Sequence, residues 1–296
     1  MNGTGSVNLG DTMRIVAATD FSVGSDRALR RAALLSSKLG APLTLVHVVE
    51  GDGPLTTLPT DRAAASDLLE EQSRTLRESY RLDVDWIVQV DDVYAGILAA
   101  AEEKAADLII IGPHRRSLSD LIVGSTAQKL ILRTPLPLLV AVDLPSSNYS
   151  SALLTLDFDH VSEFAARKAV VMGLFDHTEA VVMHAFDAPA EQLMRRAMEA
   201  SAKIADYVNA EGVSASDKLR KVLREISIPP MDPMVAPIKG SVARTILDTA
   251  REISSDLIVL GTNQRRGLAR TLIGSVAVDV VRDADRDLLI IPVEGA

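Results

Sequence analysis

The chain has 296 residues, of which 47% are apolar and 24% are charged, and its formal net charge is −9. This balance excludes a disordered or fibrous protein, and the acidic charge argues against a nucleic-acid-binding surface, which needs clustered lysine and arginine. The absence of cysteine excludes disulfides, thiolate metal sites and a cysteine nucleophile.

The N-terminal residues, MNGTGSVNLGDT, contain neither a basic region nor an apolar stretch, so they do not resemble a signal peptide. The longest apolar runs, at residues 108–112 and 288–293, are far shorter than the roughly 20 residues that a membrane helix needs. We therefore expect a cytoplasmic protein without a membrane partner.

Short apolar runs alternate with amphipathic segments along the first half of the chain. The runs are continuous, as in strands buried on both faces, and lie at residues 14–19, 43–49, 86–90, 108–112 and 136–142. The segments between them carry apolar residues at helical spacing. We expect Ser25 to cap the first helix and Gly40 to end it. Strands that alternate with helices predict a doubly wound, parallel α/β sheet.

The second half of the chain repeats the first. Residues 14–50 match residues 151–187 at an offset of 137, and a later block matches at an offset of 149. The two offsets differ by 12, which places an insertion of that length between residues 188 and 239. There, the segment VSASDKLRKVLREI has the pattern of an additional helix. A Pro/Ser/Asn cluster at 144–151 is typical of a linker, so we predict domains at residues 12–145 and 150–296.

Polar and glycine residues recur where strands are predicted to end. Asp20 and Gly112 follow the first and fourth strands, and Asp157 and Gly261 hold the same positions in the second copy. Ligands bind open α/β sheets at the carboxyl ends of strands, where the strand order reverses. If the first and fourth strands are neighbours, each copy has a crevice lined by that aspartate and that glycine. Alternatively, the aspartates only initiate turns.

The loop after the fourth strand begins with glycine and ends with Gly-Ser at a predicted helix start. These pairs are Gly124-Ser125 and Gly274-Ser275. Backbone N–H groups, a helix dipole and a hydroxyl meet there, which favours an anion such as phosphate. The same residues also suit a structural role, in which glycine ends the strand and Gly-Ser caps the helix.

These features together resemble the universal stress protein family. The resemblance rests on Asp20, the LVHVV and DLIIIG strands and the loop that runs from glycine to Gly-Ser, and it covers residues 12–143 and 150–293. It implies two tandem, five-stranded domains of the adenine nucleotide alpha hydrolase-like fold. In the family's nucleotide-binding members, adenine and ribose lie by the first-strand aspartate and the second-strand end. The triphosphate, with a divalent metal, lies on the loop.

The resemblance implies a nucleotide site in each copy. In the second copy its residues are Asp157, Ala185, Gly261, Thr262, Gln264, Gly274, Ser275 and Val276. In the first copy they are Asp20, Val48, Gly112, His114, Gly124, Ser125 and Thr126.

Both copies depart from the family's loop pattern of Gly, two residues, Gly, nine residues and Gly-Ser or Gly-Thr. Gln264 or Arg115 replaces the middle glycine, and the first copy's loop is one residue shorter. Only the second copy keeps the spacing, so ATP with Mg²⁺ is expected there, and no protein metal ligand is assigned.

Three functions stay open at this point. They are a nucleotide-responsive stress regulator, an interaction module of the same fold without nucleotide, and a weak ATP hydrolase. The sequence contains no nucleophile elbow, Walker lysine or zinc spacing, so no catalytic residue is assigned. His47 and His184 lie in predicted strands, and we expect them to be partly buried structural residues rather than general bases.

The last predicted strand of each copy indicates how the two copies assemble. In the family's single-domain members two chains pair through this strand, and here both copies belong to one chain. We therefore predict that residues 136–142 and 287–293 pack together as an intramolecular pseudo-dimer. A further homodimer and an unidentified protein partner stay open.

Overall fold

The computed structural model describes residues 12–51, 57–113, 126–226, 228–264 and 275–294, without the side chains of residues 264, 275 and 294. The elements of the first half are β1 (Ile15–Ala18), α1 (Val23–Leu39), β2 (Leu43–Glu50), α2 (Leu58–Tyr80), β3 (Val84–Asp91), α3 (Val93–Glu103), β4 (Leu108–Ile111), α4 (Thr126–Arg133) and β5 (Leu138–Val140). The second half consists of β6 (Ser151–Thr155), α5 (His160–Val171), β7 (Glu179–Phe186), α6 (Glu191–Arg196), α7 (Ser201–Glu225), β8 (Asp232–Pro237), α8 (Val242–Glu252), β9 (Leu257–Gln264), α9 (Ser275–Asp283) and β10 (Asp287–Glu294).

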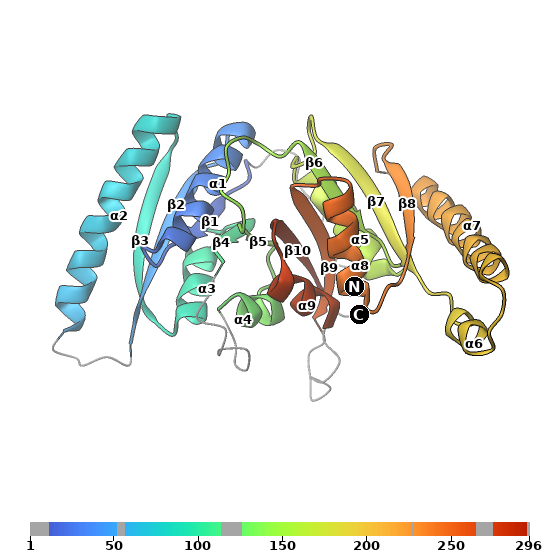
Figure 1. Cartoon of the computed structure of the whole chain (residues 1–296). Coiled ribbons are helices and arrows are strands. Elements are labelled where there is room, and N and C mark those ends of the chain that lie inside the picture. The colour runs from blue at the N-terminus through green and yellow to red at the C-terminus, as the bar shows by residue number, and fades with distance from the viewer. Residues whose placement is uncertain (1–11, 52–56, 114–125, 227, 265–274, 295–296) are drawn as a thin grey trace, which may run out of the picture.

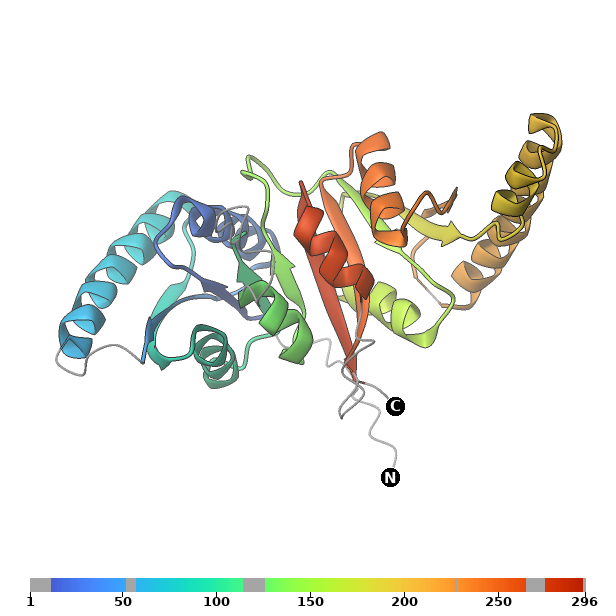
Figure 2. The ribbon, with the colours of Figure 1, turned by 60° about the horizontal axis from the view of Figure 1, so that its bottom comes forward.

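All these strands form one sheet, in the order β3-β2-β1-β4-β5-β10-β9-β6-β7-β8 (Figure 1). Strands within each half are parallel, which confirms the predicted doubly wound α/β fold. The last strands of the two halves, β5 and β10, pair antiparallel, with Leu139 opposite Leu289. In Figure 2 the green β5 and the red β10 lie side by side in the centre. The predicted pairing of the last strands is therefore confirmed, and it joins two five-stranded sheets edge to edge.

Alternating strand residues supply two apolar layers, one on each face of the sheet. Ile15 and Leu45 belong to the layer that includes buried residues of α1, α2, α5 and α7. Val16 and Val46 belong to the opposite layer, which includes buried residues of α3, α4, α8 and α9. Because both faces are covered, the strands read as continuous apolar runs in the sequence.

The first helix of each half begins with a side-chain cap. Ser22 is the N-cap of α1, and its Oγ accepts a hydrogen bond from the backbone N–H of Ser25 at 3.3 Å. The expectation that Ser25 is the cap is therefore wrong, because the helix begins at Val23 and places Ser25 in its first turn. Asp159 caps α5 in the same way. Gly40 ends α1 with a φ of 62°, as expected.

The extra length of the second half lies mainly before α7. The segment VSASDKLRKVLREI is not an additional helix but the C-terminal part of α7, with its final residue as the C-cap. Leu219 and Ile226, from this segment, are buried against the sheet layer, so it takes the place that α2 has in the first half. The added element is the short helix α6, which contacts the start of α7 (Figure 1).

A buried ionic cluster ties the linker to both halves. Arg31 of α1 donates from Nε to Oδ2 of Asp287 at 2.7 Å, and both side chains are at most 5% exposed. Asp287 also accepts hydrogen bonds from the Tyr149 hydroxyl at 2.7 Å and from the backbone N–H groups of Val142 and Asp143 at 2.8 and 3.0 Å. Asp287 thus satisfies its buried charge with groups from α1, the linker and the end of β5.

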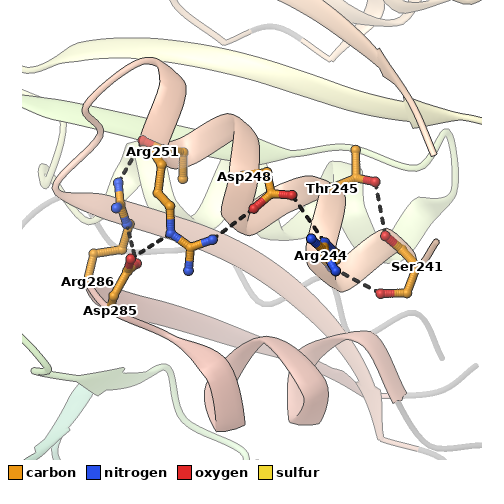
Figure 3. Close-up of polar contacts among 8 residues, drawn as sticks. Ser241, Arg244, Thr245, Asp248, Arg251, Asp285 and Arg286 are labelled. Atoms are coloured by element: carbon orange, nitrogen blue, oxygen red, sulfur yellow. Dashed lines mark hydrogen bonds and ion pairs between the residues drawn. The ribbon is translucent and has the colours of Figure 1, made fainter. Parts of the chain in front are cut away.

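A second, surface-exposed set of ion pairs holds the start of β10 against α8 (Figure 3). Asp285 accepts hydrogen bonds from Arg251 at 2.7 Å and from Arg286 at 2.8 Å, and Arg251 also contacts Asp248 at 2.8 Å. Arg286 and Arg251 lower the pKa of Asp285 to about 2, because they stabilise its ionised form.

Candidate ligand site at the carboxyl ends of the strands

The sheet order places one topological switch point in each half. β1 lies between β2 and β4, and β6 lies between β7 and β9. The first and fourth strands of each copy are therefore neighbours, as the crevice hypothesis requires. At both places the chain leaves the first strand towards one side of the sheet and later returns on the other side.

In the first half, an Asp-Phe pair turns the chain out of β1. Asp20 is exposed, and Phe21 has a φ of 61°, which is uncommon for a bulky residue. The Phe21 ring stacks on His47 of β2 with centroids 4.4 Å apart. His47 contacts the carbonyl oxygen of Thr19 through Nδ1 at 2.9 Å, so it buttresses the turn.

The second half repeats this arrangement with tighter packing. Phe158 has a φ of 54°, and its ring centroid lies 3.9 Å from that of His184. His184 is 8% exposed and contacts the carbonyl oxygen of Leu156 through Nδ1 at 2.8 Å. The expected burial of both histidines is confirmed, partial for His47 and nearly complete for His184. The two phenylalanines were missed as site residues, although their coincidence within the repeat was a usable signal.

The two strand-end aspartates differ in what their carboxylates contact. Asp20 accepts the backbone N–H of Ser22 at 3.0 Å, and although partial burial opposes it, hydrogen bonding by Ser22 lowers the pKa of Asp20. The side chain of Asp157 is 84% exposed, and its Oδ1 lies 3.9 Å from His184 Nδ1, beyond hydrogen-bond distance. The turn thus occupies one oxygen of Asp20, whereas the Asp157 carboxylate faces solvent.

A cation lies beside the second of these aspartates. Lys218 of α7 places its Nζ 4.3 Å from the ring centroid of Phe158. Burial lowers the pKa of His184, and Lys218 adds to this effect. Reduced hydration beside the strand ends raises the pKa of Asp157, which His184 and Lys218 oppose. The described cation–ring contacts include none at Phe21, so the cation distinguishes the second site from the first.

The strand-end glycines let helices approach the sheet. A Cβ on Gly112 would lie 2.4 Å from the carbonyl oxygen of Gly24 in α1. A Cβ on Gly261 would lie 3.0 Å from Cβ of Ala165 and 3.1 Å from the carbonyl oxygen of Val161, both in α5. Close packing between strand and helix thus accounts for glycine at both positions without a phosphate.

The fourth strands of the two halves have different lengths. β4 stops at Ile111, whereas β9 continues through Gly261 and pairs with β10 as far as Gln264 opposite Glu294. The expectation that Gly261 ends its strand is therefore wrong, because the longer β10 provides a partner for the added residues. Thr262 follows Gly261 in this extension and is 3% exposed. Its Oγ1 is buried, and within the part of the chain that the structure describes it has no hydrogen-bond partner; the same holds for Oδ1 of Asn263.

The other predicted site residues lie as follows. Val48 packs against α3, where its methyl groups lie 2.7 and 2.8 Å from a Cβ built on Gly96. Ala185 is partly buried on β7, and Thr126 and Val276 are partly buried at the starts of α4 and α9. Gln264 and Ser275 are placed by their backbone only, in β9 and at the first position of α9. The predictions for His114, Gly124, Ser125 and Gly274 lie outside the described residues.

Metal-ligand clusters and membrane-spanning helices are both absent from the ranges that the structure describes. Nowhere in these ranges do three or more His, Cys, Asp or Glu side chains gather as a metal ion would need. No helix within the same ranges is long and apolar enough to span a membrane.

Relatives of known family match almost the whole chain. The model of the universal stress protein family matches residues 12–141 and 148–292. A universal stress protein of Mycolicibacterium smegmatis is 23% identical over 297 residues, covering 94% of this chain and 96% of the relative. Universal stress protein G of Escherichia coli O157:H7 is 30% identical over 125 residues, covering 39% and 87%.

Solved structures show the same fold over the tandem arrangement. A universal stress protein from Archaeoglobus fulgidus has a TM-score of 0.71 at 15% identity, covering 95% of this chain and 98% of that chain. A protein from Pseudomonas aeruginosa described as a putative universal stress protein has a TM-score of 0.65 at 18% identity, covering 96% and 94%. The family match over both halves and the shared fold lead to one conclusion: the chain belongs to the universal stress protein family.

Proposed function

We propose that this protein is a cytoplasmic stress-response regulator that binds an adenine nucleotide in its second half, at the ends of β6 and β9. The observation that carries the proposal is the buried Thr262 hydroxyl, which has no hydrogen-bond partner among the described residues. A buried hydroxyl without a partner costs about 1–3 kcal/mol. An acceptor on a ligand, such as a phosphate or ribose oxygen, would remove that cost.

Strand register brings Thr262 to the same level as Asp157. The pairing of β6 with β9 ends with Leu154 opposite Val259, and Asp157 and Thr262 each follow three residues further along their chain segments. A solvent-facing carboxylate and a hydroxyl therefore flank the switch point. The carboxylate suits ribose hydroxyls, which are donors, and the hydroxyl suits an acceptor on the same ligand.

The first half offers less at the equivalent place. The repeat aligns Thr262 with Pro113, which has neither a hydroxyl nor a backbone N–H. Asp20 already accepts a hydrogen bond from Ser22. These differences favour the second half as the nucleotide site.

The residues at the ends of β6 and β9 suit a nucleotide better than a metal ion bound without one. Asp157 and Thr262 would hold the ligand, and the first N–H groups of α9, from Ser275 onward, would bind an anionic group by the helix dipole. Mg²⁺ would supply charge neutralisation of the phosphates and would be held mainly by phosphate oxygens and water. The proposed activity is binding, and sustained release of inorganic phosphate from ATP would contradict it.

Calorimetric titration with Mg-ATP tests the proposal on the intact chain. We expect Thr262→Val and Asp157→Asn each to weaken binding about tenfold, equivalent to about 1.4 kcal/mol. The matched variant Asp20→Asn, in the first half, should leave affinity unchanged. Loss of binding in Asp20→Asn alone would show that the nucleotide binds in the first half and would contradict the proposal. No heat with the wild-type chain would favour an interaction module without nucleotide.

A further inference from the structure

The extension of β9 carries a second buried polar atom directly beside Thr262. Asn263 is the next residue, and its Oδ1 is buried without a hydrogen-bond partner among the described residues. An amide oxygen can only accept, so the group that satisfies it is either an N–H or O–H donor or a cation. Buried polar atoms in folded proteins are nearly always satisfied, so this oxygen needs a partner that the described part of the chain does not supply.

The edge of β9 that faces β6 gives a ligand access to both of these residues. Thr262 and Asn263 extend from opposite faces of the strand, because successive strand residues alternate. The pairing of β6 with β9 ends at Val259, whereas β9 continues along β10 as far as Gln264. Among the described residues, no strand pairs with the β6 side of this extension. A ligand along that edge can therefore be approached by Thr262 from one face and by Asn263 from the other.

The charge of the proposed nucleotide makes a cation the better partner for this oxygen. Thr262 and the first N–H groups of α9 are proposed to bind ribose or phosphate oxygens, and ionised phosphates are acceptors only. The amide oxygen of Asn263 would repel a phosphate unless a cation lay between them. In the ranges that the structure describes, no protein group donates to this oxygen. Carbonyl oxygens suit hard divalent cations such as Mg²⁺ and Mn²⁺.

The sequence of the first half does not offer this ligand at the equivalent position. The repeat aligns Asn263 with His114, whose imidazole suits zinc, copper or iron better than Mg²⁺. Clusters of three or more His, Cys, Asp or Glu side chains that could hold a metal ion by themselves are absent from the described ranges. A cation in the second half would thus combine the oxygens of a bound nucleotide with a protein oxygen.

We propose that Oδ1 of Asn263 binds the divalent cation that accompanies the nucleotide, directly or through a water molecule of that cation. The inference rests on the nucleotide site proposed for the second half. Mg²⁺ keeps several waters and usually takes only one or two protein oxygens besides phosphate oxygens, so a single amide ligand fits its coordination habits. Asn263 thereby makes the second half select the metal-bound nucleotide over the free nucleotide.

Calorimetric titration of the full chain with ATP tests this, once with Mg²⁺ and once with EDTA. We expect the wild-type chain to bind at least about tenfold more tightly with Mg²⁺. Asn263→Leu keeps the side-chain size but removes the oxygen, and it should bring the two dissociation constants within about threefold of each other. Asn263→Asp, which retains an oxygen ligand, should keep the tenfold preference. The control Thr262→Val should weaken binding by the same factor in both conditions.

Paramagnetic Mn²⁺ provides a readout of position that does not depend on the variants. In nuclear magnetic resonance of the full chain with ATP, a small amount of Mn²⁺ should broaden the amide signals of Asn263 more than those of Gly112 in the first half. Equal broadening at both places would overturn the proposal.

The titrations separate the failure of this inference from the failure of the nucleotide site. Equal loss of affinity with Mg²⁺ and with EDTA in Asn263→Leu would show that the oxygen pairs with a donor of the nucleotide itself, which would overturn the proposal. Wild-type binding of equal strength in both conditions would also overturn it and would leave the nucleotide site intact. No wild-type binding in either condition would contradict both.

Discussion

Phe21 and Phe158 show how single residues shape the strand ends. Both take the left-handed backbone conformation, which costs a non-glycine residue about 1–2 kcal/mol. Each ring packs on a histidine that itself contacts a backbone carbonyl just after the strand, so ring packing offsets the backbone strain. The result is a sharp turn directly after each strand-end aspartate. Backbone strain thus lies at the place where the ligand is proposed to bind.

At the residue scale, His184→Asn should reduce the acid sensitivity of the fold. Burial lowers the pKa of His184 below 6.5, so the unfolded chain binds a proton more readily than the native chain. Stability therefore falls as pH drops through about 6.5 towards the native pKa. Asparagine retains a donor for the Leu156 carbonyl but does not titrate. Urea unfolding between about pH 7 and pH 5 should show a flatter dependence in the variant. Identical slopes would contradict this account.

At the scale of elements, β9 and β10 continue beyond the points where β4 and β5 stop. The added residues form a parallel ladder from Gly261 opposite Ile291 to Gln264 opposite Glu294. This extension carries Thr262 into a buried position opposite Pro292 of β10, whereas the first half has proline after its strand-end glycine. Extra sheet in the second half thus creates the unsatisfied hydroxyl on which the nucleotide proposal rests.

Helix packing on the fourth strands predicts unequal costs for adding one methyl group. Gly112→Ala should destabilise the protein by about 1–3 kcal/mol, because the new Cβ meets backbone atoms of Gly24 that cannot move independently. Gly261→Ala should cost less, since its nearest neighbour lies 3.0 Å away rather than 2.4 Å. Denaturant unfolding of both variants measures the difference. A larger loss for Gly261→Ala would contradict the packing explanation.

The contact between α8 and the start of β10 predicts a pH-dependent contribution to stability. The pKa of Asp285 is about 2 in the native state, so its contribution is present above the unfolded value of 3.8 and is lost as pH falls through about 2. The side chain is 42% exposed, and we expect Asp285→Asn to cost only about 0.5–1 kcal/mol near neutral pH. Unfolding free energies of the two proteins should converge in acid. A constant difference would contradict the ion-pair explanation.

At the scale of the whole molecule, the two halves share one sheet and one buried ionic cluster. The antiparallel pairing of β5 with β10 leaves neither strand as an open edge. Asp287 occupies the position that Pro137 has in the first half, and its charge is satisfied by Arg31, Tyr149 and two backbone N–H groups just after β5. The two similar halves are therefore held together in part by an ionic cluster that has no counterpart on the other side of the pseudo-symmetric interface.

Removing the Asp287 carboxylate should make the two halves unfold less cooperatively. Asp287→Ala leaves Arg31 buried without its partner, which typically costs about 3–5 kcal/mol. We expect scanning calorimetry to show one transition for the wild-type chain and a lower, broader or divided transition for the variant. Asp285→Ala, two residues away on the surface, is the matched control. A loss below about 1 kcal/mol in Asp287→Ala would show that β5–β10 pairing alone holds the interface.

The sequence by itself determined the repeat, the order of strands and helices and the strand-end positions of the aspartates, whereas the pairing of the last strands was predicted from the family resemblance. Apolar runs and identical residues at a constant offset can be read directly from the sequence, so recognising them requires no knowledge of distant contacts. The tertiary structure alone decided why Gly112 is glycine, how far β9 extends and what Asp287 binds. It also decided that the Thr262 hydroxyl is buried without a hydrogen-bond partner among the described residues. Each of these depends on atoms from segments far apart in the chain, because close packing and buried hydrogen bonding are satisfied only when those segments meet.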